Sequence, residues 1–183
     1  SDTAKVASSM LDVIALRVDK HETLEMFAAN SSVPVINALS DLSHPCQILA
    51  DLMTFKENSA NELEKVCWIG DGNNVCNSYV EASKILDFEL SIYCPKEYSP
   101  DPSFLNYAKE NSSFANSREE AAKGADIITT DVWVSMGDEK TKERAFQGYF
   151  VDTGLIENTG KESIFLHCLP AHRGQEITFE LME

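Results

Sequence analysis

Polar side chains suited to binding a small anion or carbonyl group gather at residues 40–55, SDLSHPCQILADLMTF. Pro45 fits the first position of a helix, with Ser43 or His44 as the N-cap. His44 and Gln47, three residues apart, would then share one face at the helix start, near the positive end of the helix dipole. Their donors are expected to converge there. A plain helix start with two polar side chains facing water accounts for the same residues, so the stretch alone leaves both interpretations open.

A glycine pair and two asparagines form the second candidate, in WIGDGNNV. The stretch resembles a dinucleotide-binding fingerprint, in which a strand is followed by two glycines, here Gly70 and Gly72, and then by a helix. Val75 stands where the third glycine belongs, and the next strand ends in IYCP without a carboxylate for a ribose. A nicotinamide site is therefore disfavoured. Asn73 and Asn74 are expected at a helix N-terminus, where they can cap the helix or bind a carboxylate or ammonium group.

An acidic residue closes the expected strand ADIITTD and precedes the turn VSMG. The carboxylate of Asp131 can hold an ammonium group. The turn at residues 135–137 can present backbone groups to the same ligand. A loop that begins with an aspartate turn signal accounts equally for these residues.

A cysteine and two histidines stand close together in FLHCLPAHRG. Cys168 ends an expected buried strand, where a cysteine is usually an inert small hydrophobe. Without a base beside it, this thiol is no nucleophile candidate. His167 and His172 are candidate bases, but they lack metal-ligand spacing with a third donor, and we predict no metal site. We also predict a cis peptide before Pro170, in a tight turn that would aim the preceding carbonyl inward.

Composition narrows the classes of function. The 183 residues carry a formal net charge of −15, and 43% of them are apolar, enough for a packed core. The four arginines are scattered, which disfavours nucleic acid and anionic membranes as partners. The five cysteines are odd in number and form no CxxC pair, which is typical of reduced thiols in a cytosol-like compartment. No apolar run has the length of a membrane span, so we expect a soluble protein.

Strand and helix patterns alternate along the chain and must position these side chains. The predicted fold class is α/β, with parallel sheets flanked by helices on both faces. Ligands of such sheets bind beyond the carboxyl ends of the strands, where all four candidate stretches lie. Strands are expected at 13–18, 33–38, 65–71, 88–95, 125–131 and 162–168, and helices at 2–14, 21–30, from 45 onwards and at 73–86.

A polar stretch at 56–64, KENSANELE, separates two sets of elements. We predict a boundary there, with one lobe at 1–57 and a second at 64–183. The chain begins at Ser1, inside a pattern that already has helix period. We therefore expect it to be part of a longer protein.

Taken in order, HPCQ, GDGNN, DVWVSMG and HCLP resemble the motifs of the aspartate/ornithine carbamoyltransferase superfamily, and within it the ornithine carbamoyltransferases. The resemblance covers essentially the whole chain. It implies a transcarbamoylase-like fold whose second lobe is Rossmann-like. Residues 1–57 would form part of a carbamoyl-phosphate-binding lobe, and residues 64–183 an ornithine-binding lobe with an incomplete C-terminal end.

The resemblance also implies roles for individual residues. It implies catalytic roles for Arg17, His44 and Cys168. Of these, Arg17 and His44 would donate hydrogen bonds to the carbamoyl oxygen. The predicted substrate-binding residues are Gln47, Asn74, Asp131, Ser135, Met136 and Leu169, the last through its backbone carbonyl. No cofactor and no metal are implied.

The implied reaction transfers the carbamoyl group of carbamoyl phosphate to the δ-amino group of ornithine, giving citrulline and phosphate in arginine biosynthesis or the urea cycle. The implied location is the cytoplasm, or the mitochondrial matrix in a eukaryote, and the full-length parent would be a homotrimer. The family's Ser-Thr-Arg-Thr loop and C-terminal arginine are absent from these residues, so the chain by itself is expected to be inactive. Alternatives are transfer to putrescine, aspartate or N-acetylornithine, a non-catalytic binding fragment, and a nicotinamide-dependent oxidoreductase.

Overall fold

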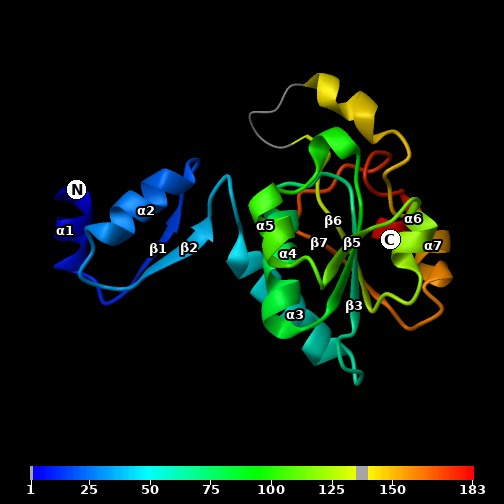
Figure 1. The fold of residues 1–183 in the computed structure, drawn as a ribbon, viewed down its shortest axis with the longest axis horizontal. Coiled ribbons are helices and arrows are strands. Elements are labelled where there is room, and N and C mark those ends of the chain that lie inside the picture. The colour runs from blue at the N-terminus through cyan, green and yellow to red at the C-terminus, as the bar shows by residue number, and fades with distance from the viewer. Residues whose placement is uncertain (1, 135–139) are drawn as a thin grey trace.

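A small parallel sheet forms the N-terminal part of the protein, which we describe from a computed structural model covering residues 2–134 and 140–183. Its two strands are paired in register until Leu16, after which an irregularity brings Arg17 opposite Leu39. Two helices accompany the sheet, and Figure 1 shows this unit at one end of the molecule. The elements are α1 (Asp2–Ser8), β1 (Ile14–Arg17), α2 (His21–Ala29) and β2 (Val35–Leu39).

A five-stranded sheet in the order β5-β4-β3-β6-β7 forms the larger part, and all of its neighbouring strands are parallel. Its strands are β3 (Lys65–Ile69), β4 (Glu89–Tyr93), β5 (Ser112–Phe114), β6 (Ile127–Thr130) and β7 (Ile164–His167). The helices are α3 (Pro45–Asn58), α4 (Asn74–Leu86), α5 (Pro102–Tyr107), α6 (Arg118–Ala122) and α7 (Thr153–Asn158). Short 3-10 helices lie at Lys96–Tyr98, Lys140–Phe146 and Glu180–Met182.

Both faces of the large sheet are covered. Along β3, Val66 and Trp68 belong to a core cluster shared with α3 and α4, and Cys67 and Ile69 belong to a second cluster shared with α6 and α7. Side chains of a strand alternate between faces, so these residues pack against different helix layers. Helix α3 joins the two parts, because it follows β2 directly and contributes Ile48 to the core of the large sheet.

The predicted α/β class with parallel sheets is confirmed, and each predicted strand and helix is present. The N-terminal helix ends at Ser8 rather than near residue 14, because Ile14 is buried as the first residue of β1. Pairing with β2 outweighs the local helical period there. Strand β5 was not predicted, since its three residues SSF carry little periodic signal.

Helix α3 extends to Asn58, so the predicted boundary stretch at 56–64 begins inside a helix. Within the described residues, no helix is both long and apolar enough to cross a membrane.

Candidate functional site

His44 occupies the N-cap position of α3, and Pro45 is the first helical residue as predicted. The His44 side chain makes no capping hydrogen bond, so its imidazole is available for another role. Its backbone N–H donates to Ser78 Oγ of α4 at 2.7 Å. The ring nitrogen Nδ1 is buried and lacks a hydrogen-bond partner among the residues that the structure describes.

The charge state of His44 depends on both parts of the molecule. Burial lowers the pKa of the imidazole below its ordinary value, and the positive charge of Arg17 lowers this pKa further. The carboxylate of Asp131 acts on the pKa in the opposite direction. Arg17 is exposed at the end of β1, and Asp131 is buried just after β6. His44 is therefore a neutral hydrogen-bonding group at neutral pH, within electrostatic reach of a cation and an anion.

Gln47 lies one turn from a buried carboxylate. Its Nε2 donates to Asp51 Oδ1 at 2.9 Å, and Tyr79 Oη donates to Asp51 Oδ2 at 2.7 Å. Asp51 is 7% exposed, and Tyr79 is fully buried in α4. The sequence predicted that the Gln47 donor converges with that of His44, whereas in the structure it pairs with Asp51, because a buried carboxylate requires donors.

The first turns of α4 hold the loop at 40–44 that carries His44. Asn74 Nδ2 donates to the Ser40 carbonyl at 2.7 Å, and Asn77 Nδ2 donates to the Leu42 carbonyl at 2.9 Å. Together with the bond from the His44 N–H to Ser78, these contacts connect the N-terminal part to the large sheet. Asn74, which the resemblance assigned to ornithine, thus already has a partner across this junction.

Asp131 is the centre of a second cluster. Asn73 Nδ2 donates to Asp131 Oδ2 at 2.7 Å, and Cys168 Sγ donates to Asp131 Oδ1 at 2.9 Å. The predicted capping role of Asn73 is confirmed, because its Oδ1 accepts from the N–H groups of Val75 and Cys76. Burial raises the pKa of the Cys168 thiol well above its ordinary value, and the neighbouring Asp131 carboxylate raises it further. Cys168 is thus a protonated thiol and a hydrogen-bond donor rather than a nucleophile.

The turn after β7 is held by a histidine and a buried acid. The Leu169–Pro170 peptide is cis, as predicted, and Leu169 has a φ of 53°. The Leu169 N–H donates to His167 Nδ1 at 2.9 Å, so the ring hydrogen lies on Nε2, which faces Glu176 Oε1 at 3.2 Å. Glu176 is fully buried and also accepts from the backbone N–H of His172. This network fixes the backbone from which Leu169 presents its carbonyl.

One group of described side chains has the composition of a metal site. The ligand atoms of Asp131, His167 and Cys168 lie within 4.8 Å of one another. Each side chain already has partners: the thiol donates to Asp131, and both ring nitrogens of His167 are hydrogen-bonded. A metal could bind only after these bonds were broken. We assign no metal to the group.

A buried ion pair joins the 3-10 helix at Lys140–Phe146 to the residues just after β3. Lys142 Nζ lies 2.6 Å from Asp71 Oδ2, and both side chains are largely buried. Lys142 also lies over the ring of Tyr98, 5.1 Å from its centroid. Ser135 and Met136, which were predicted to bind ornithine, lie outside the described residues.

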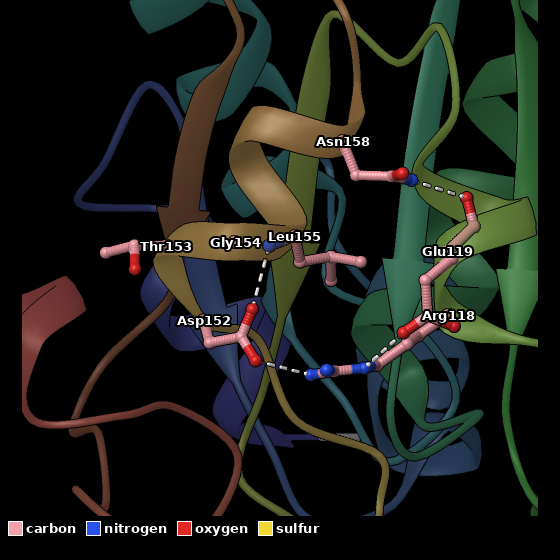
Figure 2. Close-up of a pocket in the computed structure, with 7 residues that line it drawn as sticks. All are labelled: Arg118, Glu119, Asp152, Thr153, Gly154, Leu155 and Asn158. Carbon is pink, nitrogen blue, oxygen red and sulfur yellow. Dashed lines mark hydrogen bonds and ion pairs between the residues drawn. The ribbon is translucent and has the colours of Figure 1, made fainter.

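A cavity of about 440 Å³ lies apart from these clusters, between α6 and α7. Figure 2 shows Arg118 extended between two carboxylates that line it. The guanidinium contacts Asp152 and Glu119, each at 2.8 Å. Its charge is therefore balanced within the protein, and none of the predicted site residues lines this cavity.

Partners in these networks that were not among the predicted site residues include Asp51, Tyr79 and Glu176. Asp51 stands four residues after Gln47, a spacing at which glutamine and aspartate side chains meet on a helix, so a local signal existed. Tyr79 is contributed by a different helix. Glu176 is nine residues from His167, across an irregular turn with no repeating pattern.

Comparisons with known proteins agree with the residue pattern. The profile of the aspartate/ornithine carbamoyltransferase Asp/Orn binding domain matches residues 63–183, and that of the carbamoyl-P binding domain matches residues 1–57. The chain is 46% identical over 186 residues to an ornithine carbamoyltransferase of Halorhodospira halophila, and 48% identical over 187 residues to one of Pseudomonas syringae pv. tomato. Both alignments cover 100% of this chain, and 62% and 61% of those proteins.

Solved structures give the same result. An ornithine carbamoyltransferase from Thermus thermophilus superposes with a TM-score of 0.87 at 44% identity, covering 98% of this chain and 60% of that one. The anabolic ornithine carbamoyltransferase from Campylobacter jejuni superposes with a TM-score of 0.91 at 41% identity, covering 99% of this chain and 64% of that one. The chain thus spans about three fifths of the length of these relatives.

Proposed function

The chain belongs to the aspartate/ornithine carbamoyltransferase family, and we propose that its activity is transfer of the carbamoyl group from carbamoyl phosphate to the δ-amino group of ornithine. The names of its relatives support this assignment. The observation that carries it is the position of His44, which lies within electrostatic reach of both Arg17 and Asp131. We infer that the side chains proposed to hold the two substrates face one space.

The carbamoyl half of the proposed site stabilises charge on the carbonyl oxygen. When an amine attacks the carbamoyl carbon, negative charge develops on that oxygen. The guanidinium of Arg17 and the neutral imidazole of His44 donate to it, as in an oxyanion hole. The Gln47 side chain and the Leu169 carbonyl orient the carbamoyl nitrogen.

The ornithine half positions the amine. We assign Asp131, Asn74 and Cys168 to contacts with ornithine, together with Ser135 and Met136. Held in this way, the δ-amino group attacks as in an intramolecular reaction. The new C–N bond forms as the bond from the carbamoyl carbon to the phosphate oxygen breaks, and the leaving phosphate accepts the amine proton. Products are citrulline and phosphate, and Cys168 stays protonated throughout.

The two profile matches also support a division of labour, with residues 1–57 serving carbamoyl phosphate and residues 64–183 serving ornithine. We further propose that the protein works as a homotrimer in arginine biosynthesis, in the cytoplasm or, in a eukaryote, in the mitochondrial matrix. Light scattering of the protein that contains this chain tests the trimer, and a monomer at micromolar concentration would contradict it.

Product analysis tests the reaction. We expect citrulline when the longer protein that contains this chain is incubated with carbamoyl phosphate and ornithine, and little product with putrescine, aspartate or N-acetylornithine. Arg17→Ala should reduce kcat/KM at least about tenfold, because it removes a charged hydrogen bond worth about 1.5–3 kcal/mol. Arg144→Ala, which removes an exposed guanidinium, is the matched control and should leave the rate unchanged. Faster turnover with another amine would overturn the assignment to ornithine.

A further inference from the structure

We propose that Asp51 is a positioning residue that turns the oxygen of the Gln47 amide toward the carbamoyl nitrogen, so that the site selects carbamoyl phosphate over acyl phosphates that lack an NH2 group. The inference rests on the proposed function, since it concerns how the same site recognises its first substrate. Asp51 does not touch the substrate in this scheme and acts through Gln47.

The orientation of the Gln47 amide follows from the chemistry of its partner. An ionised carboxylate only accepts hydrogen bonds, so the amide end that faces Asp51 must be the NH2 end. The distance of 2.9 Å from Nε2 to Oδ1 fits this arrangement. The amide oxygen, Oε1, then lies on the opposite side of the amide carbon and can accept a hydrogen bond from a ligand.

Asp51 is itself held in place by α4. Tyr79 Oη donates to Oδ2 at 2.7 Å, so each oxygen of the carboxylate has a donor. Burial and the adjacent Asp51 charge raise the pKa of Tyr79, which keeps the phenol protonated as a donor. Burial raises the pKa of Asp51 above its ordinary value, and the hydrogen bonds from Tyr79 and Gln47 oppose this effect and favour the charged form. The carboxylate is thus fixed on both sides within a packed interface between α3 and α4.

Asp51 lies near the proposed site, as this role requires. Its negative charge contributes to the raised pKa of Cys168, which places Asp51 within electrostatic reach of the HCLP turn. Gln47 lies between Asp51 and His44 along α3, because one turn of the helix separates it from each. A change in the orientation of this amide would therefore change its hydrogen bond to the carbamoyl end of the ligand.

Two stable ligands separate this role from a merely structural one. Phosphonoacetamide carries the NH2 group of carbamoyl phosphate, whereas acetonylphosphonate has a methyl group in its place. We expect the wild-type protein to bind phosphonoacetamide about three- to tenfold more tightly by calorimetry, the contribution of one neutral hydrogen bond. In Asp51→Asn the preference should fall close to one, because an asparagine can face Gln47 with either end of its amide.

Tyr79→Phe is the matched variant. It removes the other donor to Asp51 but leaves the carboxylate and its bond to Gln47, so stability should fall while the ligand preference stays. A purely structural role would instead make both variants lose affinity for both ligands equally. Asp51→Asn with an unchanged preference would overturn the inference.

A measurement without ligand keeps the inference separate from the proposed function. In NMR spectra of the free protein, one Gln47 side-chain amide proton should exchange slowly and shift downfield, and Asp51→Asn should remove this signature while Tyr79→Phe retains it. A Gln47 amide that exchanges as fast as an exposed glutamine would overturn the inference. Failure of the wild-type protein to bind either phosphonate would instead count against the proposed function.

Discussion

His44 is the residue at which the two proposed halves of the site meet. Its imidazole is influenced by Arg17, from the small sheet, and by Asp131, from the large one. These effects have opposite signs, so substitutions on the two sides should move the pKa of His44 in opposite directions. The site can therefore be probed without substrate.

Arg17→Ala should raise the pKa of His44, because it removes a positive charge that disfavours the imidazolium. Arg17→Lys keeps the charge and serves as the control. The measurement is a titration of the His44 ring protons by NMR. Since the pKa in the folded protein lies below that of the unfolded chain, the unfolded chain binds more protons, and stability falls as the pH decreases from about 6.5. An identical His44 pKa in Arg17→Ala would show that the two side chains are not close.

Asn73 caps α4 and also donates to Asp131, and two substitutions can separate these two contacts. Asn73→Ala should lower the free energy of unfolding by about 1 kcal/mol through loss of the helix cap. Asn73→Ser keeps a capping oxygen and should retain most of the stability. Both variants lose the side-chain amide that donates to Asp131, so both should weaken ornithine binding. Urea unfolding and calorimetry with ornithine measure the two effects, and unchanged ornithine affinity in Asn73→Ser would show that the Asn73–Asp131 contact does not contribute to ornithine binding.

At the scale of residues, the sequence correctly placed the residues that stand at helix starts. His44 next to Pro45 and Asn73 before α4 were found because caps and helix starts depend on neighbours in the chain. The bond from Asn73 to Asp131 joins residues 58 positions apart, and no periodic pattern encodes such a pair. Only packing of β3 beside β6 brings these residues together.

At the scale of elements, the turn from β3 into α4 depends on a close approach of two backbones. A side chain on Gly72 would collide with the backbone of Tyr98, Ser99 and Pro100, and the Gly72 N–H donates to the Tyr98 carbonyl. Gly72→Ala should therefore lower the free energy of unfolding by about 3 kcal/mol or more. This turn precedes Asn73 and Asn74, so the same substitution should also displace both amides.

Gly154→Ala is the control for that substitution. Gly154 lies in α7, and an added methyl group would make only an ordinary contact, 3.5 Å from Asp152 Oδ1. Alanine should stabilise the protein there by about 0.4–1 kcal/mol, because it reduces the freedom of the unfolded chain. Thermal unfolding of Gly72→Ala and Gly154→Ala measures both stability changes. Equal stability changes at the two positions would show that the approach at Gly72 is not tight.

Elements with a clear apolar pattern were predictable, and those that depend on contacts with distant segments were not. The strands of the large sheet other than β5 are apolar runs flanked by turn residues, and α3 and α4 have a clear helical period. The three-residue β5 and the end of α1 depend on contacts with other segments. The carboxyl ends of the strands were correctly expected to gather the polar side chains, since this follows from the parallel arrangement alone.

At the scale of the whole molecule, charge is the dominant property. The chain has 30 acidic and 15 basic residues. At neutral pH the excess negative charges repel one another, and this repulsion destabilises the folded state. Raising KCl from about 0.1 to about 1 M shortens the screening length from about 10 to about 3 Å. We expect Tm to rise by about 2–4 °C, equivalent to about 1 kcal/mol.

The same salt series near the isoelectric point provides the control. At about pH 4.6 the net charge is close to zero, and added KCl should have little effect on Tm. A fall in Tm with salt at neutral pH would mean that ion pairs such as Arg118–Asp152 outweigh the net repulsion.

The junction between the two parts of the molecule is formed with backbone atoms of the 40–44 loop. Asn74 and Asn77 bind the carbonyls of Ser40 and Leu42, and Ser78 accepts from the N–H of His44. Carbonyl groups are present in every residue type, so the loop's side chains can change without loss of these bonds. The chemistry of this loop can therefore vary separately from its attachment, and we expect a loop of different sequence but equal backbone shape to keep these three bonds to α4.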